Sequence, residues 1–194
     1  MRQSSLLPIL LSASFLVSSC KGVGDYKFDT VTFVISKPIP PAAGPQPGIH
    51  IDTNTKVSSI TGGTVKSTKP YAIAVDFTDD TFTYAEAEFT KVTVTYADGT
   101  NDPGAAALKL PISIPARRYE TTNSMAGGRI VKTKLRVISG KIPGSITRDK
   151  PLTLRIEGNL IKDDGTKIPF AIKQNYTVTI DKTTKPWGDV MQDR

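Results

Sequence analysis

The chain has 194 residues, of which 38% are hydrophobic and 22% charged, with 15 Gly, 14 Pro, one Cys, one His and a net charge of +7. This composition is too polar for a multi-span membrane protein and too apolar for a disordered chain, so it indicates one compact domain. The single Cys excludes disulfide scaffolds and multi-cysteine metal sites, and the single His excludes metal sites built on His pairs.

The N-terminal segment has the features of an export signal. Arg2 supplies positive charge, and an apolar run extends from Leu6 to Val17. A membrane-spanning helix needs about 20 apolar residues, so a run of this length predicts the core of a signal peptide. The run ends in Val17-Ser18-Ser19-Cys20, which contains the only Cys of the chain.

This ending resembles the lipobox of bacterial lipoproteins, in which an aliphatic and small triplet precedes an obligatory Cys. The resemblance is confined to the N-terminal segment. It implies that residues 1–19 are a signal peptide and that Cys20 carries a diacylglyceryl group and a further acyl chain such as palmitate. Two or three acyl chains make a stable lipid anchor, whereas one gives marginal membrane binding. The alternative is an ordinary cleaved signal that leaves an unpaired Cys.

The resemblance also implies a location in the bacterial cell envelope. In such lipoproteins an Asp after the lipidated Cys commonly means retention in the inner membrane. This chain has Lys21 at that position, so the outer membrane is favoured.

Positive charge is concentrated in the C-terminal half of the chain. Residues 1–108 carry eight Lys and Arg against ten Asp and Glu, whereas residues 109–194 carry seventeen against eight. Such asymmetry is typical of a surface that binds polyanions. Because an exported chain does not meet nucleic acid, we expect an anionic envelope polymer or another envelope protein as the partner.

The remaining sequence predicts a lipidated tether at 20–25, an all-β domain at 26–181 and a polar tail at 182–194. A Pro-rich connection at 37–48 is expected to bridge two sheets. Period-two alternation predicts strands near 26–35, 71–77, 82–96, 108–114, 131–137, 152–156 and 168–180, and 116–128 is expected to be a polar loop. This pattern favours a single antiparallel β-sandwich, immunoglobulin-like in the broad sense, with a barrel as the second choice.

A basic strand is the leading candidate for a binding surface. Its cations alternate with Val131, Leu135 and Val137, which places the aliphatic residues in the core and the cations in solvent. The candidate polyanion-binding residues are Arg129, Lys132, Lys134, Arg136, Lys150 and Arg155. The alternative is a solvated face that protects an edge strand from aggregation.

Candidate catalytic residues are few, and none belongs to a complete set. Glu86 and Glu88 lie about 6.6 Å apart along one strand, a spacing that would suit an inverting glycosidase. The two glutamates alternate with Ala85, Ala87 and Phe89, which indicates that they lie on the solvent-exposed face of the strand. His50 and Asp52 share a strand face as a general-base pair would, but no nucleophile accompanies them.

Other polar clusters have simpler explanations, and we expect no metal and no cofactor. Two groups of oxygen-bearing side chains could in principle hold Ca²⁺. One is Asp76, Asp79 and Asp80, and the other is Asn159, Asp163 and Asp164. Both lack the ligand spacing of an EF-hand and are typical of turns. Residues 126–129 predict a hairpin tip rather than a phosphate loop. Trp187 is expected to fold back over one end of the domain.

The sequence therefore predicts a lipid-anchored envelope protein with a non-catalytic binding or structural module. One alternative is a small glycan- or lipid-modifying hydrolase, which would need convergent carboxylates or a Ser close to His50. A second alternative is a barrel-type carrier of an apolar ligand, which would need a large dry cavity.

Overall fold

The computed structural model describes residues 24–37, 44–58, 63–124 and 130–186, and at residues 37, 121–124 and 130–133 it describes only the backbone. Half of the proline-rich connection lies outside the described residues, as do the predicted signal peptide, Cys20, the expected hairpin tip at 126–129 and Trp187. In the described part, no helix is long enough and apolar enough to span a membrane.

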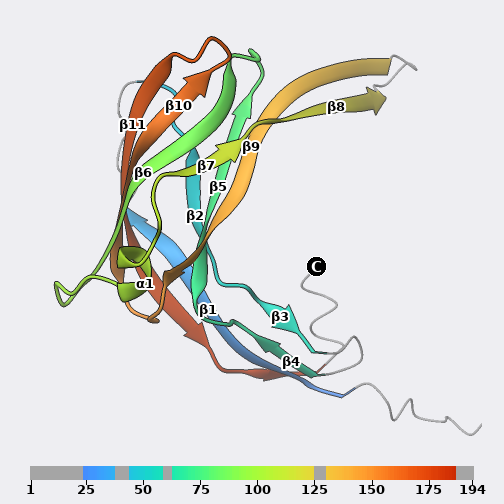
Figure 1. The fold of residues 1–194 in the computed structure, drawn as a ribbon. Helices are drawn as coiled ribbons and strands as arrows, with labels where there is room; N and C mark the ends of the chain where they lie inside the picture. Colours follow the sequence, from blue (N-terminus) through green and yellow to red (C-terminus); the bar gives the residue numbers. More distant parts are fainter. Residues whose placement is uncertain (1–23, 38–43, 59–62, 125–129, 187–194) are drawn as a thin grey trace, which may run out of the picture.

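The described chain is nearly all β, as the alternation predicts (Figure 1). Its elements are β1 Tyr26–Lys37, β2 Gly48–Asp52, β3 Lys56–Val57, β4 Gly63–Lys66, β5 Tyr71–Asp79, β6 Tyr84–Tyr96, α1 Pro103–Ala106, β7 Ile112–Pro115, β8 Arg117–Ser124, β9 Ile130–Ile146, β10 Leu152–Lys162, β11 Lys167–Asp181 and β12 Thr184–Lys185.

The strands form two sheets. One has the order β3-β4-β1-β11-β10-β6-β7, with β12 paired to β1, and the other has the order β2-β5-β9-β8. Since β1 and β2 belong to different sheets, the chain between them crosses from one sheet to the other. In Figure 1 the larger sheet curls, and the β8–β9 hairpin projects from the body of the molecule.

Three details differ from the sequence-based expectations. The larger sheet is mixed rather than purely antiparallel, because β1 and β4 run parallel, with Asp29 opposite Lys66. Much of the expected loop at 116–128 is strand β8, whose polar residues obscure its pairing with β9. The expected polar tail at 182–194 contains strand β12, where Lys185 pairs with Tyr26.

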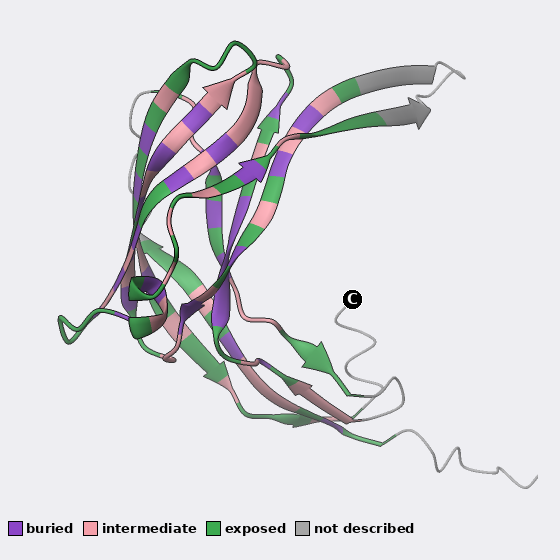
Figure 2. Cartoon of the chain, viewed as in Figure 1, coloured by how far each residue is buried: buried purple, intermediate pink, exposed green. Residues whose placement is uncertain are grey.

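The space between the sheets is filled by apolar side chains from both. Buried residues alternate with more exposed ones along β10, as Figure 2 shows. The rings of Phe89 and Phe170 pack edge to face at 5.7 Å between centroids. Gly158 lies beside this pair, and a Cβ there would come within 2.2 Å of the Glu88 carbonyl oxygen. The core therefore requires glycine at this position.

The expected orientation of β9 is wrong. Arg136 is 7% exposed and Ile138 and Ile142 are fully buried, whereas Leu135 and Val137 are only half-buried. The alternation of 131–137 is misleading because the core residues of β9 lie further along the strand. These residues continue the face of Arg136, and no feature of the sequence shows that this cation has partners inside the fold.

A buried carboxylate holds one end of the two-sheet fold together. Asp102, 1% exposed, caps the one-turn helix α1 by accepting from the Gly104 amide at 2.7 Å. It also accepts from the Thr147 amide at 2.8 Å, the Thr147 hydroxyl at 2.9 Å and the Tyr96 hydroxyl. Burial by itself raises the pKa of Asp102, but these hydrogen bonds outweigh it and hold the pKa below its usual value.

Replacement of Asp102→Ala should lower the free energy of unfolding by at least about 3 kcal/mol, because several buried donors lose their acceptor. The contribution of the carboxylate is present above its unfolded-state pKa of about 3.9 and is lost as the pH falls through the lowered folded-state pKa. Urea denaturation at pH 7 measures the loss. Asp80→Ala, at an exposed position, is the control and should change stability by no more than about 0.5 kcal/mol.

Candidate binding surfaces

Glu86 and Glu88 lie on the same strand, but their environment does not resemble that of a catalytic pair. The Glu88 carboxylate accepts from Lys167 at 2.9 Å and from Asn159 at 3.0 Å. The Lys167 and Asn159 contacts lower the pKa of Glu88, whereas a general acid needs a raised pKa. Ala87 and Phe89, on the alternate face, are fully buried, as expected.

His50 pairs with a different carboxylate from the expected one. Its Nδ1 lies 3.7 Å from Asp76 on the neighbouring strand β5, and both side chains are 58% exposed. Asp52 instead forms an ion pair with Lys141. These four residues lie on the outer side of the smaller sheet, where solvent reaches them.

In the two acidic groups, Asp79 and Asp163 are held by protein donors. Asp79 is 4% exposed and accepts from the amides of Thr81, Thr83 and Tyr84 at 2.7–3.1 Å, which shapes the turn between β5 and β6. Asp163 pairs with Arg136. Among the described residues, no group of three or more His, Cys, Asp or Glu side chains could hold a metal ion.

The six cations of the predicted polyanion-binding surface do not come together. Lys150 pairs with Asp98 at 3.1 Å beside the β6–α1 turn, and Arg155 pairs with Glu157 at 2.8 Å on the larger sheet. Lys134 is exposed on β9, opposite Glu120 of β8. Arg129 lies outside the described residues, and the side chain of Lys132 is not described.

Arg136 is the sixth cation, and it connects the two sheets. Its guanidinium donates to the Asp163 carboxylate at 2.7 Å and to the Tyr84 carbonyl oxygen at 3.1 Å. The guanidinium also lies over the Phe82 ring, 5.7 Å from its centroid. Arg136 is therefore an internal structural residue and is not available to an external polyanion.

The β8–β9 hairpin has two different faces. Arg118, Glu120, Lys134 and Arg136 share the face that leads to the body of the protein. On the other face, Tyr119 lies opposite Leu135 and is 46% exposed. Arg117 is its neighbour on this face and lies opposite Val137. An exposed aromatic ring beside a cation on a projecting hairpin is suited to contact a partner.

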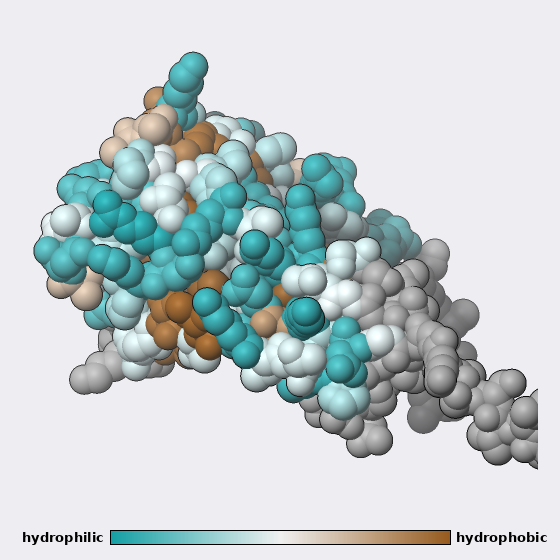
Figure 3. All heavy atoms as spheres, turned by 90° about the horizontal axis from the view of Figure 1, so that it is seen from below, coloured by the Kyte–Doolittle hydropathy of each residue, from teal (hydrophilic) through white to brown (hydrophobic). Residues whose placement is uncertain are grey.

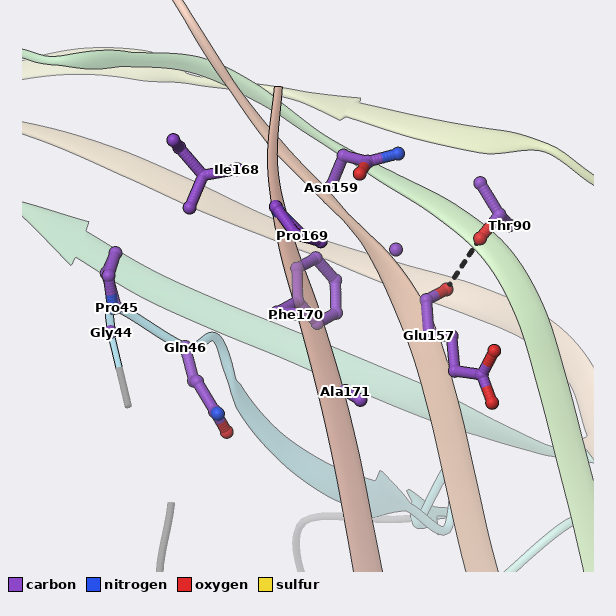
Figure 4. A pocket seen from close by; sticks show the side chains of 11 residues that line it. Gly44, Pro45, Gln46, Thr90, Glu157, Asn159, Ile168, Pro169, Phe170 and Ala171 are labelled. Atoms are coloured by element: carbon purple, nitrogen blue, oxygen red, sulfur yellow. Dashed lines mark hydrogen bonds between the residues drawn. The ribbon is translucent and has the colours of Figure 1, made fainter. Parts of the chain in front are cut away.

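A groove of about 490 Å³ lies on the larger sheet (Figure 4). Residues 44–46 form one side, and Thr90, residues 157–159 and residues 168–171 form the rest. Thr90 donates to the Glu157 carbonyl oxygen at 3.1 Å, and the Glu157 carboxylate lies between Arg155 and Lys91. Glu157 is the charged residue in the lining of this groove, and it is thus already paired.

A second cleft, of about 470 Å³, combines cations with an apolar floor. It lies where β1, β4 and the end of β11 meet the segments that precede β5 and β10. The residues that line it are Asp29, Val31, Lys66, Ser67, Thr68, Lys69, Tyr71, Asp149, Ile180 and Lys182. Sequence reasoning missed this cleft because its lysines are far apart in the chain and belong to no alternating pattern.

One wall of this cleft is a hydrogen-bonded network. The Tyr71 hydroxyl donates to Asp149 at 2.7 Å, and Lys69 forms an ion pair with the same carboxylate at 2.5 Å. Burial raises the pKa of Tyr71, and the bond to Asp149 raises it further, so the hydroxyl remains protonated. Asp149 and Lys69 thus neutralise each other.

Comparison of this chain with protein-family models, with curated proteins and with solved structures finds no match.

Replacement of Arg136→Ser should lower the midpoint of thermal unfolding by roughly 4 °C or more, since the Tyr84 carbonyl and Asp163 lose their shared donor. Lys134→Ser, two residues away on the same strand face, should shift the midpoint by less than about 1 °C because Lys134 is exposed. Circular dichroism melting curves of both variants make the comparison. Equal midpoints would contradict the internal role of Arg136.

Proposed function

We propose that this chain is an exported lipoprotein of the bacterial cell envelope, anchored through Cys20, whose domain is a non-catalytic binding module. We further propose that the domain is a β-sandwich, immunoglobulin-like in the broad sense. The outer membrane is the favoured location because Lys21 follows the anchor. The partner is another envelope protein or an anionic envelope polymer.

One geometric observation carries the binding role. The described chain begins at one end of the molecule, and the β8–β9 hairpin projects at the opposite end (Figure 1). A domain attached by its N-terminus would therefore hold this hairpin away from the membrane. The exposed ring of Tyr119 and the adjacent Arg117 then become the natural contact surface.

The surroundings of the candidate catalytic residues favour a binding module over a hydrolase. Glu88 is held by Lys167 and Asn159, and His50 pairs with Asp76 on a solvent-exposed face. The filled space between the sheets favours it over a carrier, because Ile73, Phe89 and Leu154 are fully buried there.

Replacement of Cys20→Ala should leave the precursor uncleaved and move the protein out of the detergent phase of a Triton X-114 partition. The reason is that both the cleavage and the acyl chains depend on the Cys thiol. Mass spectrometry of the wild-type N-terminus should find an acylated Cys20. A mature chain that begins elsewhere would refute the anchor.

A photo-crosslinker tests the binding surface in intact cells. The change Tyr119→benzoylphenylalanine should give a discrete cross-linked species, because this side chain is exposed on the projecting hairpin. The matched control is Lys173→benzoylphenylalanine, at an exposed position on β11. Gel electrophoresis and mass spectrometry identify the adduct. The same products from both positions would argue against the hairpin as the contact surface.

A further inference from the structure

Lysines from distant parts of the sequence gather around the second cleft. Lys66 ends β4, Lys69 precedes β5 and Lys182 follows β11, and all three line the cleft. Lys56 pairs with Lys66 across β3 and β4, and Lys27 lies two residues before Asp29 on the same face of β1. The parallel pairing of β1 with β4 places Lys66 beside β1, and the antiparallel pairing of β1 with β11 places Lys182 there.

Two of the three lysines that line the cleft lack a counter-ion within the described part of the chain. Lys69 is paired with Asp149, but no described carboxylate forms an ion pair with Lys66 or Lys182. Asp29 is the other carboxylate of the cleft and lies opposite Lys66. The cleft lysines therefore outnumber its carboxylates, and Lys27 and Lys56 add further positive charge beside it.

The floor of the cleft is apolar. Val31 and Tyr71 are buried, and Ile180 is 50% exposed, so its side chain is accessible beside the lysines. Figure 3, which shows the molecule from below, has hydrophobic atoms between hydrophilic ones on the visible face. A ligand that satisfied both the ammonium groups and Ile180 would carry an anionic group next to an apolar part.

The cleft lies near the start of the described chain. Asp29 belongs to the first strand and lies nine positions after Cys20 in the sequence. An extended chain spans at most about 3.6 Å per residue, so the cleft lies within roughly 32 Å of an acylated Cys20. If the chain is anchored through Cys20 as proposed, this end of the domain faces the lipid surface.

We propose that the cleft of Lys66, Lys182 and Ile180 binds the anionic headgroup region of a membrane phospholipid. The ammonium groups of Lys66 and Lys182 contact the phosphate, and the Ile180 side chain contacts the glycerol and the first acyl carbons. Each lysine near an anionic membrane contributes a modest electrostatic attraction, and several together orient a domain on the surface. The orientation relative to the membrane rests on the proposed function, but the ligand chemistry of the cleft does not.

The test uses the full chain with Cys20→Ala, so that no acyl anchor contributes to membrane binding. Co-sedimentation compares vesicles of phosphatidylcholine alone with vesicles that also contain phosphatidylglycerol. We expect tighter binding to the anionic vesicles, and the double change Lys66→Gln with Lys182→Gln should weaken this difference at least about tenfold. The apolar N-terminal run and Arg2 are common to all variants, so the comparison between variants isolates the contribution of the cleft lysines.

The matched control is Lys109→Gln with Lys173→Gln, which removes the same charge from exposed positions outside the cleft. It should weaken binding less than about threefold. An equal loss in both double variants, or no preference for anionic vesicles, would overturn the proposal. The acylation state of wild-type Cys20 does not enter this comparison, so failure of the anchor and failure of the cleft are separate results.

A second comparison distinguishes a lipid from a free phosphate ester. Dihexanoyl-phosphatidylglycerol below its micelle concentration should displace the protein from anionic vesicles at a lower concentration than glycerol 3-phosphate does. Ile180→Ser, at a half-exposed position, should remove this advantage. Equal potency of the two compounds on the wild-type chain would mean that the cleft recognises phosphate alone and would overturn the lipid assignment.

Discussion

The chain must cross between two sheets without leaving buried backbone groups unpaired, and the Asp102 carboxylate meets this requirement at one end of the fold. It accepts the amides of Gly104 and Thr147, which belong to the segments that follow β6 of the larger sheet and β9 of the smaller sheet. Gly104 packs so closely here that a Cβ would lie 2.3 Å from the Gly144 carbonyl oxygen. Burial alone disfavours a charged carboxylate, so the hydrogen bonds are necessary for it to remain ionised.

The opposite end uses the same physical solution with an added cation. Asp79 accepts the amides of the β5–β6 crossing, and Arg136 joins that crossing to the β10–β11 turn through the Tyr84 carbonyl and Asp163. Arg136 is therefore buried and does not contribute to the charged surface. A cation in an alternating strand is thus not evidence of a binding face until its partners are known.

The cleft and the hairpin follow from the topology of the sheets. The parallel pairing of β1 with β4 brings Lys66 next to the first strand and close to Lys182, while the long strands β8 and β9 extend beyond the body. These two surfaces lie toward opposite ends of the molecule (Figure 1). An anchored domain with this arrangement has one end for the lipid surface and one for a partner.

The sequence by itself determined the all-β class and most strand positions, because period-two alternation is a local consequence of strand geometry. Burial of Ala87 and Phe89 followed from the same pattern. Only the tertiary structure decided which face of β9 is internal, since Arg136 is stabilised by residues 52 and 27 positions away along the chain. The same holds for the lysine cleft, because strand order decides that Lys66, Lys69 and Lys182 line one cleft, and alternation does not encode strand order.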